Sequence, residues 1–117
     1  MPLGLTANRA GRAIGQTVAG TPTPVGDIVG TAVVKAFELE CGRTGLLDLE
    51  RARDAGYDPI SETITRSSQS GYYPNAADTT VTLTADRATD RLLGGSIVGT
   101  NRAAIRIDTL QRHSTVI

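Results

Sequence analysis

Hydrophobic and polar residues alternate most clearly in the second half of the chain. Within residues 79–99, Val81, Leu83 and Ala85 alternate with threonines, which is the two-residue period of a half-exposed strand. A charged turn follows, and residues 92–98 then return as a second apolar run. The pattern predicts a β-hairpin in this region.

Further strands are predicted nearer the N-terminus. Residues 28–40 are rich in β-branched side chains and carry apolar residues at both parities near their middle. This favours one strand that is central or lies against another surface. Residues 41–45 continue it as a short strand or turn. Residues 58–66 alternate weakly between apolar and polar side chains and predict another strand.

Helical periodicity occurs at three places. Residues 5–19 place their apolar side chains on one stripe, and Thr6 is the candidate N-cap. Residues 46–56 predict a second helix with Asp48 as its candidate cap. Residues 101–112 predict a closing helix. Because strands outnumber helices and hairpins dominate, the fold class is α+β, with a mainly antiparallel sheet and flanking helices.

A linker separates the first helix from the rest. Residues 21–27 contain two prolines and one glycine, which oppose helix formation and keep the chain extended. We therefore expect a boundary here, with residues 1–20 on one side and residues 28–117 on the other.

Composition narrows the function classes. The chain has 117 residues, and 12 Lys and Arg balance 12 Asp and Glu. A neutral chain without runs of like charge has no electrostatic preference for nucleic acid or an anionic membrane surface. Its uncharged stretches are too short and too broken for a transmembrane helix. With a single Cys, no internal disulfide can form. We expect a cytoplasmic, single-domain protein.

Candidate catalytic residues are sparse. His113 has no partner at an informative spacing and is expected in solvent. Cys41 has no metal-ligand companion and is expected as a small core residue, so no metal site is predicted. The Gly94–Gly95 pair lies within a predicted strand, where it favours close approach of another backbone or a β-bulge over phosphate binding.

The stretch GYYPNA holds two of the three tyrosines in a chain with one Phe and no Trp. Gly71 and Pro74 mark a turn or an edge. On an extended segment, adjacent residues such as Tyr72 and Tyr73 point to opposite faces. One interpretation is that one ring fills a gap in the core and the other is incidental. The alternative is that a phenol is displayed toward a site that this chain does not contain.

Four stretches in this order resemble the C-terminal end of the flavin-dependent pyridine nucleotide–disulfide oxidoreductases. They are PLGLTANRAGRAIG, GTAVVKAFELECGRTGL, GYYPNAADTTVTLTADRATDRLLGGSIVG and AAIRID. The resemblance is to the branch of coenzyme A–disulfide reductases, NADH oxidases and persulfide reductases. It implies that residues 1–20 are a detached remnant helix of an FAD-binding domain, residues 21–27 a linker, and residues 28–117 the dimerisation domain.

The resemblance also implies roles for particular residues. Full-length members join an FAD-binding domain and an NAD(P)H-binding domain to an interface domain that forms a homodimer. By this resemblance, the backbones of Leu5, Thr6 and Ala7 approach the flavin, whose negative charge a helix N-terminus can stabilise. Either Tyr72 or Tyr73 contributes to the active site of the opposite subunit.

Other family features are missing. The nucleotide-binding glycine loops and the redox-active Cys are absent, and Cys41 does not match the latter. Arg106 matches a family position, where a surface or interface salt bridge is expected. We expect this to be a piece of a longer chain, inactive and without bound FAD by itself. Residues 1–20 are then disordered or docked on another molecule. The parent uses FAD and NAD(P)H.

Two matters stay open at this point. The acceptor of the parent enzyme is coenzyme A disulfide, a persulfide, oxygen or another compound. The competing hypothesis is a stand-alone α+β protein-interaction module with no flavoenzyme context. The resemblance and the apolar residues at both parities of residues 28–40 predict a homodimer built on sheet or helix surface from residues 28–40 and 79–112.

Overall fold

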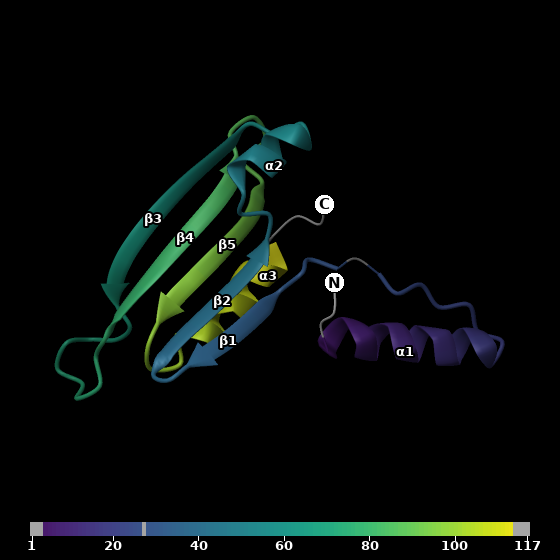
Figure 1. Ribbon diagram of the computed structural model, residues 1–117, viewed down its shortest axis with the longest axis horizontal. Helices are drawn as coiled ribbons and strands as arrows, with labels where there is room; N and C mark the ends of the chain where they lie inside the picture. Colours follow the sequence, from purple (N-terminus) through teal and green to yellow (C-terminus); the bar gives the residue numbers. More distant parts are fainter. Residues whose placement is uncertain (1–3, 27, 114–117) are drawn as a thin grey trace.

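The computed structural model describes residues 4–26 and 28–113. Its helices and strands, in chain order, are α1 (Gly4–Val18), β1 (Ala32–Ala36), β2 (Leu39–Gly45), α2 (Leu49–Asp54), β3 (Pro59–Ser67), β4 (Asp78–Asp86), β5 (Leu92–Gly99), the 3₁₀ helix η1 (Ala103–Arg106) and α3 (Ile107–His113). Figure 1 shows one sheet with α2 at one end and α1 set to the side.

The five strands form one sheet in the order β1-β2-β5-β4-β3, and every neighbouring pair is antiparallel. The hairpin predicted for residues 79–99 is confirmed as β4 and β5, in which Val81 pairs with Ile97. The strand predicted at residues 58–66 is β3. The predicted α+β class with a mainly antiparallel sheet is therefore confirmed.

The prediction of one strand over residues 28–40 is wrong. The chain forms a hairpin instead, in which β1 ends at Ala36 and β2 begins at Leu39. Phe37 in the turn adopts a positive φ of 53° and is 96% exposed. Two-residue hairpin turns normally use Gly or Asn for such backbone angles. Neither Phe37 nor Glu38 is a Gly or Asn. The pattern of apolar residues therefore predicted one continuous strand across this turn.

The helices agree with the sequence in position and differ in detail. Helix α1 is confirmed, but it begins at Gly4, so Thr6 lies inside the first turn and is not its cap. The cap of α2 is confirmed, because Asp48 Oδ1 accepts the N–H groups of Glu50 at 2.9 Å and Arg51 at 3.2 Å. The closing helix begins as η1 and continues as α3.

One face of the sheet is covered by η1 and α3, which lie behind β2 and β5 in Figure 1. Ile97, Ala103 and Ile107 form the buried core of this covered face, with Val81 and Leu110 packed against them. Gly95 permits the contact, since a Cβ there would lie 2.8 Å from Leu110 Cδ1. Burial of these side chains between the sheet and the two helices η1 and α3 supplies the apolar core of this face.

The Gly94–Gly95 pair permits close approach on both sides of the sheet, as its sequence position predicted. A Cβ on Gly94 would lie 2.7 Å from the backbone nitrogen and oxygen of Leu46. Contacts this short to backbone atoms cannot be relieved by rotating a side chain, so the segment after β2 can cross β5 only because residue 94 is glycine.

The opposite face of the sheet has no helix on it and faces the viewer in Figure 1. We call it the open face. Strand register and side-chain alternation assign to it Ala32, Val34, Ala36, Leu39, Cys41, Arg43, Ser61, Thr63, Thr65, Ser67, Asp78, Thr80, Thr82, Thr84, Asp86, Ser96 and Val98. Apolar side chains lie toward β1, β2 and β5, and hydroxyl groups lie toward β3 and β4.

Helix α1 lies on neither face of the sheet (Figure 1). Residues 28–31 and Gln111 share a small hollow with Thr6 and Arg9 of its N-terminal half, while Ile14 and Val18 are exposed. The radius of gyration is 16.9 Å, whereas a compact domain of this length has one of about 13 Å. The chain is therefore extended by its first helix. No described helix is long and apolar enough to cross a membrane.

Candidate functional site

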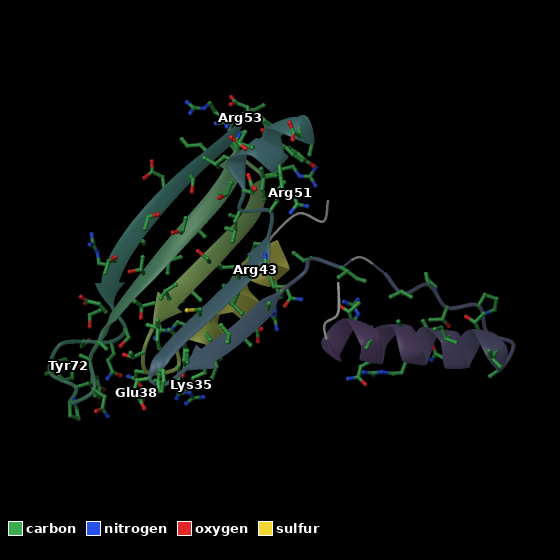
Figure 2. The ribbon with its side chains drawn as sticks, viewed as in Figure 1. Lys35, Glu38, Arg43, Arg51, Arg53 and Tyr72 are labelled. Atoms are coloured by element: carbon green, nitrogen blue, oxygen red, sulfur yellow. The ribbon has the colours of Figure 1, made fainter. Side chains whose placement is uncertain are left out.

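The two adjacent tyrosines lie on the loop between β3 and β4, residues 68–77, which we call the Tyr loop. It projects from the end of the sheet opposite α2, the end that also carries the β1–β2 turn (Figures 1 and 2). Tyr73 N–H donates to Ser70 O at 3.0 Å, and Ala76 N–H donates to Tyr73 O at 3.2 Å. The segment therefore turns twice, which confirms the turn that Gly71 and Pro74 indicated, and it is not extended.

Both tyrosine rings are exposed, Tyr72 by 81% and Tyr73 by 51%. Their centroids are 4.7 Å apart with an interplanar angle of 33°, so the two rings pack on each other. The interpretation that one ring fills a gap in the core is wrong, as is the expectation that they face opposite ways. Two phenols are instead presented together at the tip of a loop.

Two long-range hydrogen bonds fix the Tyr loop to the rest of the domain. Asn101 Nδ2 donates to Asn75 O at 2.9 Å, and Arg106 Nη2 donates to Ser68 O at 2.7 Å. Ser68 N–H donates to Ala77 O at 2.7 Å and closes the loop at its base. These contacts hold an exposed loop in one place, and Asn101 is a contributor that the sequence did not single out.

The remaining candidate residues do not gather around the Tyr loop. Leu5, Thr6 and Ala7 lie in the first turn of α1, where backbone N–H groups have no partner within the helix. His113 is exposed at the end of α3. Among residues 4–26 and 28–113, no three His, Cys, Asp or Glu side chains lie close enough to hold a metal ion.

Cys41 is not fully buried, contrary to the expectation of a core residue. It is a free thiol on the open face, where it lines a shallow hollow of about 260 Å³ together with Val34 and Val98. Arg43 is the one charged side chain that β1, β2 and β5 contribute to the open face, and Asp78 and Asp86 lie at the two ends of β4. A broad surface with so little charge suits contact with another protein surface.

One carboxyl group has a clearly displaced pKa. A hydrogen bond from the Thr89 hydroxyl at 2.5 Å, followed by one from the Asp58 N–H at 2.9 Å, lowers the pKa of Asp86 below its ordinary value of 3.8. Asp86 lies at the end of β4 distant from the Tyr loop, so this group stabilises a turn and does not belong to the candidate site.

The structure is thus an α+β domain with a five-stranded antiparallel sheet, one helix-covered face, one open face and an aromatic loop. Residues 31–114 match the family model described as pyridine nucleotide-disulphide oxidoreductase, dimerisation domain. The match extends over more than half of the chain, and the chain therefore belongs to this family.

Relatives and solved structures agree with this assignment. The chain is 35% identical over 109 residues to the NAD(P)H coenzyme A polysulfide/persulfide reductase of Pyrococcus horikoshii, covering 93% of this chain and 24% of that protein. It is 32% identical over 99 residues to the NAD(P)H sulfur oxidoreductase (CoA-dependent) of Pyrococcus furiosus, covering 85% and 22%. The chain thus spans about a quarter of the length of these relatives.

The fold is also found in a solved structure of a larger protein. The NAD-dependent persulfide reductase from A. fulgidus superimposes with a TM-score of 0.87 at 29% identity, covering 96% of this chain and 21% of that chain. The predicted resemblance and the predicted fold are thereby confirmed. The individual roles of Tyr72, Tyr73, Leu5, Thr6 and Ala7 stay predictions.

Proposed function

We propose that this chain acts as the dimerisation domain of a flavin-dependent NAD(P)H oxidoreductase and delivers the Tyr loop to the active site of its partner subunit. The observation that carries the proposal is the pair of exposed tyrosines on a loop fixed by Asn101 and Arg106. The two rings are exposed and do not pack in the core of this chain. Contact with another protein surface in the assembled dimer best explains their exposure. The cytoplasmic location stays a prediction from composition.

The open face is the surface that we propose to join two copies of the domain. Val34, Leu39 and Val98 are apolar and exposed there, and Arg43 is the one charge on the part of this face that β1, β2 and β5 form. The outer side of α3, in contrast, presents Asp108 and other polar groups. Since interface cores are depleted in charge and symmetric dimers use one self-complementary patch, the open face is the better candidate for a homodimer.

The chemical role proposed for the Tyr loop is donation of a hydrogen bond. The Tyr72 or Tyr73 hydroxyl would donate to a sulfur atom that gains negative charge as a disulfide or persulfide bond breaks in the partner subunit. A phenol supplies this donor without taking up charge itself. Packing of one ring on the other restricts both rotamers, which lowers the cost of holding the donor in place.

The FAD cofactor proposed for the parent protein would meet this chain through α1. The unpaired backbone N–H groups of Leu5, Thr6 and Ala7 suit a hydrogen-bond acceptor that gains negative charge, and FAD would supply electron transfer from NAD(P)H. The position of α1 off both sheet faces supports the division into residues 1–20, 21–27 and 28–117. By this proposal the chain alone binds no FAD and is not catalytic.

The substrate class proposed is a low-molecular-weight disulfide or persulfide. Two relatives carry names that include coenzyme A and a sulfur acceptor. Oxygen as an acceptor has weaker support, because the water-forming NADH oxidase of Lactobacillus brevis shares 21% identity with this chain and so supports the fold alone.

Substitution of single tyrosines in the full-length flavoenzyme tests the proposal. Tyr72→Phe and Tyr73→Phe each remove one hydroxyl and keep the ring packing. If one hydroxyl donates to a developing thiolate, its loss lowers kcat by about 10- to 100-fold, since a hydrogen bond to a charged group contributes about 1.5–3 kcal/mol. Turnover with NAD(P)H and the disulfide is the measurement.

Tyr57→Phe is the matched control. Tyr57 follows α2 at the opposite end of the sheet and is expected to keep full turnover. If both loop variants turn over as fast as this control, the loop has no catalytic part. The chain then serves dimerisation alone and contributes no hydroxyl group to the chemistry of the partner subunit.

A further inference from the structure

A polar hollow of about 380 Å³ lies at the base of the Tyr loop. This is within the range of about 300 to 1,000 Å³ that small-molecule sites occupy. The lining comes from two segments that are far apart in sequence, and consists of Ser68, Gln69, Asn101, Arg102, Ile105 and Arg106. Arginine is the one charged residue type in this lining.

The positive charge of this hollow is not neutralised within the described part of the chain. The ion pairs among those residues are Lys35–Glu40 and Arg87–Asp58, so Arg102 and Arg106 have no carboxylate partner there. The Tyr loop, residues 68–77, contains no charged residue. The two guanidinium groups therefore line a solvent-accessible hollow beside the uncharged Tyr loop. Such a positively charged hollow is suited to binding an anion.

The guanidinium group of Arg106 is held at the hollow by a hydrogen bond to Ser68, another residue of the lining. Its Nη2 donates to Ser68 O at 2.7 Å, and this is its one hydrogen bond within the described residues. A guanidinium group has five N–H donors in a planar fork, so most of them stay available to an oxyanion. Ser68 Oγ accepts the Ala77 N–H at 3.3 Å and keeps its own proton for donation.

Arg102 is placed by an unusual backbone. Asn101 and Arg102 both adopt left-handed conformations, with φ of 54° and 66°, at the connection from β5 to η1. Such angles are uncommon for residues other than glycine. The hydrogen bond from Asn101 to Asn75 O fixes this connection to the Tyr loop. The two arginines thus line one hollow on a rigid part of the domain.

We propose that Arg102 and Arg106 form a binding site for a phosphate group. Arginine forks bind phosphate oxygens through paired, charge-assisted hydrogen bonds, and two of them match a doubly charged group. The group is either free phosphate or the phosphate ester of a nucleotide-containing thiol substrate. The second source rests on the proposed function, since it brings a substrate to the loop that carries Tyr72 and Tyr73.

The test measures binding to the 117-residue chain itself. Backbone amide shifts in NMR are followed during titration with inorganic phosphate, and separately with adenosine 3′,5′-bisphosphate, at constant ionic strength. We expect saturable shifts in residues 68–69 and 101–106 with both compounds. Equal affinity assigns the site to free phosphate, and tighter binding of the bisphosphate assigns it to an ester. The absence of saturable shifts in these residues would overturn the proposal.

Two variants remove the charges in ways that preserve the fold. Arg102→Gly suits the left-handed backbone, and Arg106→Gln keeps a side-chain donor for Ser68 O. Each is expected to weaken phosphate binding by about 10-fold or more, from the loss of a charge-assisted hydrogen bond. The control is Arg53→Gln. Arg53 lies on α2, at the end of the sheet opposite the Tyr loop (Figure 2), and this variant should bind phosphate as tightly as the unsubstituted chain does.

The outcome separates this site from the proposed function. Equal binding by Arg102→Gly, Arg106→Gln and Arg53→Gln would show that the shifts are unspecific and would overturn the phosphate site. Turnover of the tyrosine variants does not enter this measurement. Phosphate binding can therefore be lost while the catalytic proposal holds, and retained if the tyrosines prove to have no catalytic part.

Discussion

The two faces of the five-stranded sheet contain similar aliphatic side chains but are completed differently. On the covered face, Ile97 and Ile107 are buried under a helix that the chain itself supplies. On the open face, Val34, Leu39 and Val98 stay exposed, and no helix lies over them (Figure 1). Burial of aliphatic side chains thus stabilises the fold of the single chain on one face. By our proposal, it stabilises the dimer on the other face.

Glycine positions show how the covered face was completed. Gly95 has no side chain where Leu110 approaches, and a Cβ on Gly42 would lie 3.2 Å from Ile107 Cβ. These two residues let η1 and α3 approach the strands closely. The open face has a hollow along β1 and β2 instead, lined by Val34, Cys41 and other residues. No helix of the described residues covers this hollow, so it is accessible to another molecule.

The largest effect is expected from breaking the covered face. Ile107→Ala removes a fully buried side chain and should lower the free energy of unfolding by about 4 kcal/mol, through lost burial and the cavity left behind. Ile105→Ala is the matched control, since Ile105 is 57% exposed, and it should change stability by less than about 0.5 kcal/mol. Urea unfolding measures both, and equal losses would contradict the assignment of the core.

A smaller effect, on association alone, is expected from breaking the open face. Val34→Lys places a charge in the proposed dimer surface and should weaken dimerisation on the order of 100-fold, because an unpaired charge would be buried there. The monomer should stay folded, as Val34 is 61% exposed. Sedimentation equilibrium of the chain measures the association constant.

Ile64→Lys is the control for the open face. Ile64 is 57% exposed on β3, and strand register places it on the other side of the sheet, beside Val81. It should leave dimerisation unchanged. Two results would exclude the open face as the dimer surface. The unsubstituted 117-residue chain could sediment as a monomer at every concentration, or the two lysine variants could have equal effects.

The sequence predicted those elements whose signals are local. Alternation and a charged turn marked the β4–β5 hairpin, and Asp48 marked the start of α2. The β1–β2 hairpin was missed because Phe37 occupies a left-handed turn position without the Gly or Asn that normally marks it. Hence a turn built from unusual residues is not visible in a pattern of apolar positions.

The candidate site was only partly predictable for a similar reason. Tyr72 and Tyr73 stood out because aromatic residues are scarce, but the alternation rule placed them on opposite faces when they in fact stack in a turn. The contacts that fix their loop join residues 26 and 38 positions apart. No local pattern encodes hydrogen bonds at such separations, so the roles of Asn101 and Arg106 in fixing the loop required the three-dimensional structure.

The smallest effect concerns the turn between β4 and β5 and depends on pH. Asp86 accepts hydrogen bonds from Thr89 and from the Asp58 N–H, which lower its pKa in the folded chain below the ordinary value of 3.8. The unfolded chain then binds the proton more tightly, so this stabilisation is complete above that ordinary value and is lost as pH falls through the folded pKa. Asp86→Asn should remove the dependence in this acidic window, whereas Asp54→Asn, on exposed α2, should retain it. Urea midpoints at a series of acidic pH values decide the matter. These hydrogen bonds tie Asp58, next to β3, and Thr89, in the β4–β5 turn, to Asp86 and involve neither Ile105 nor Ile107. Protonation of Asp86 should therefore lower stability without changing the difference between Ile107→Ala and Ile105→Ala.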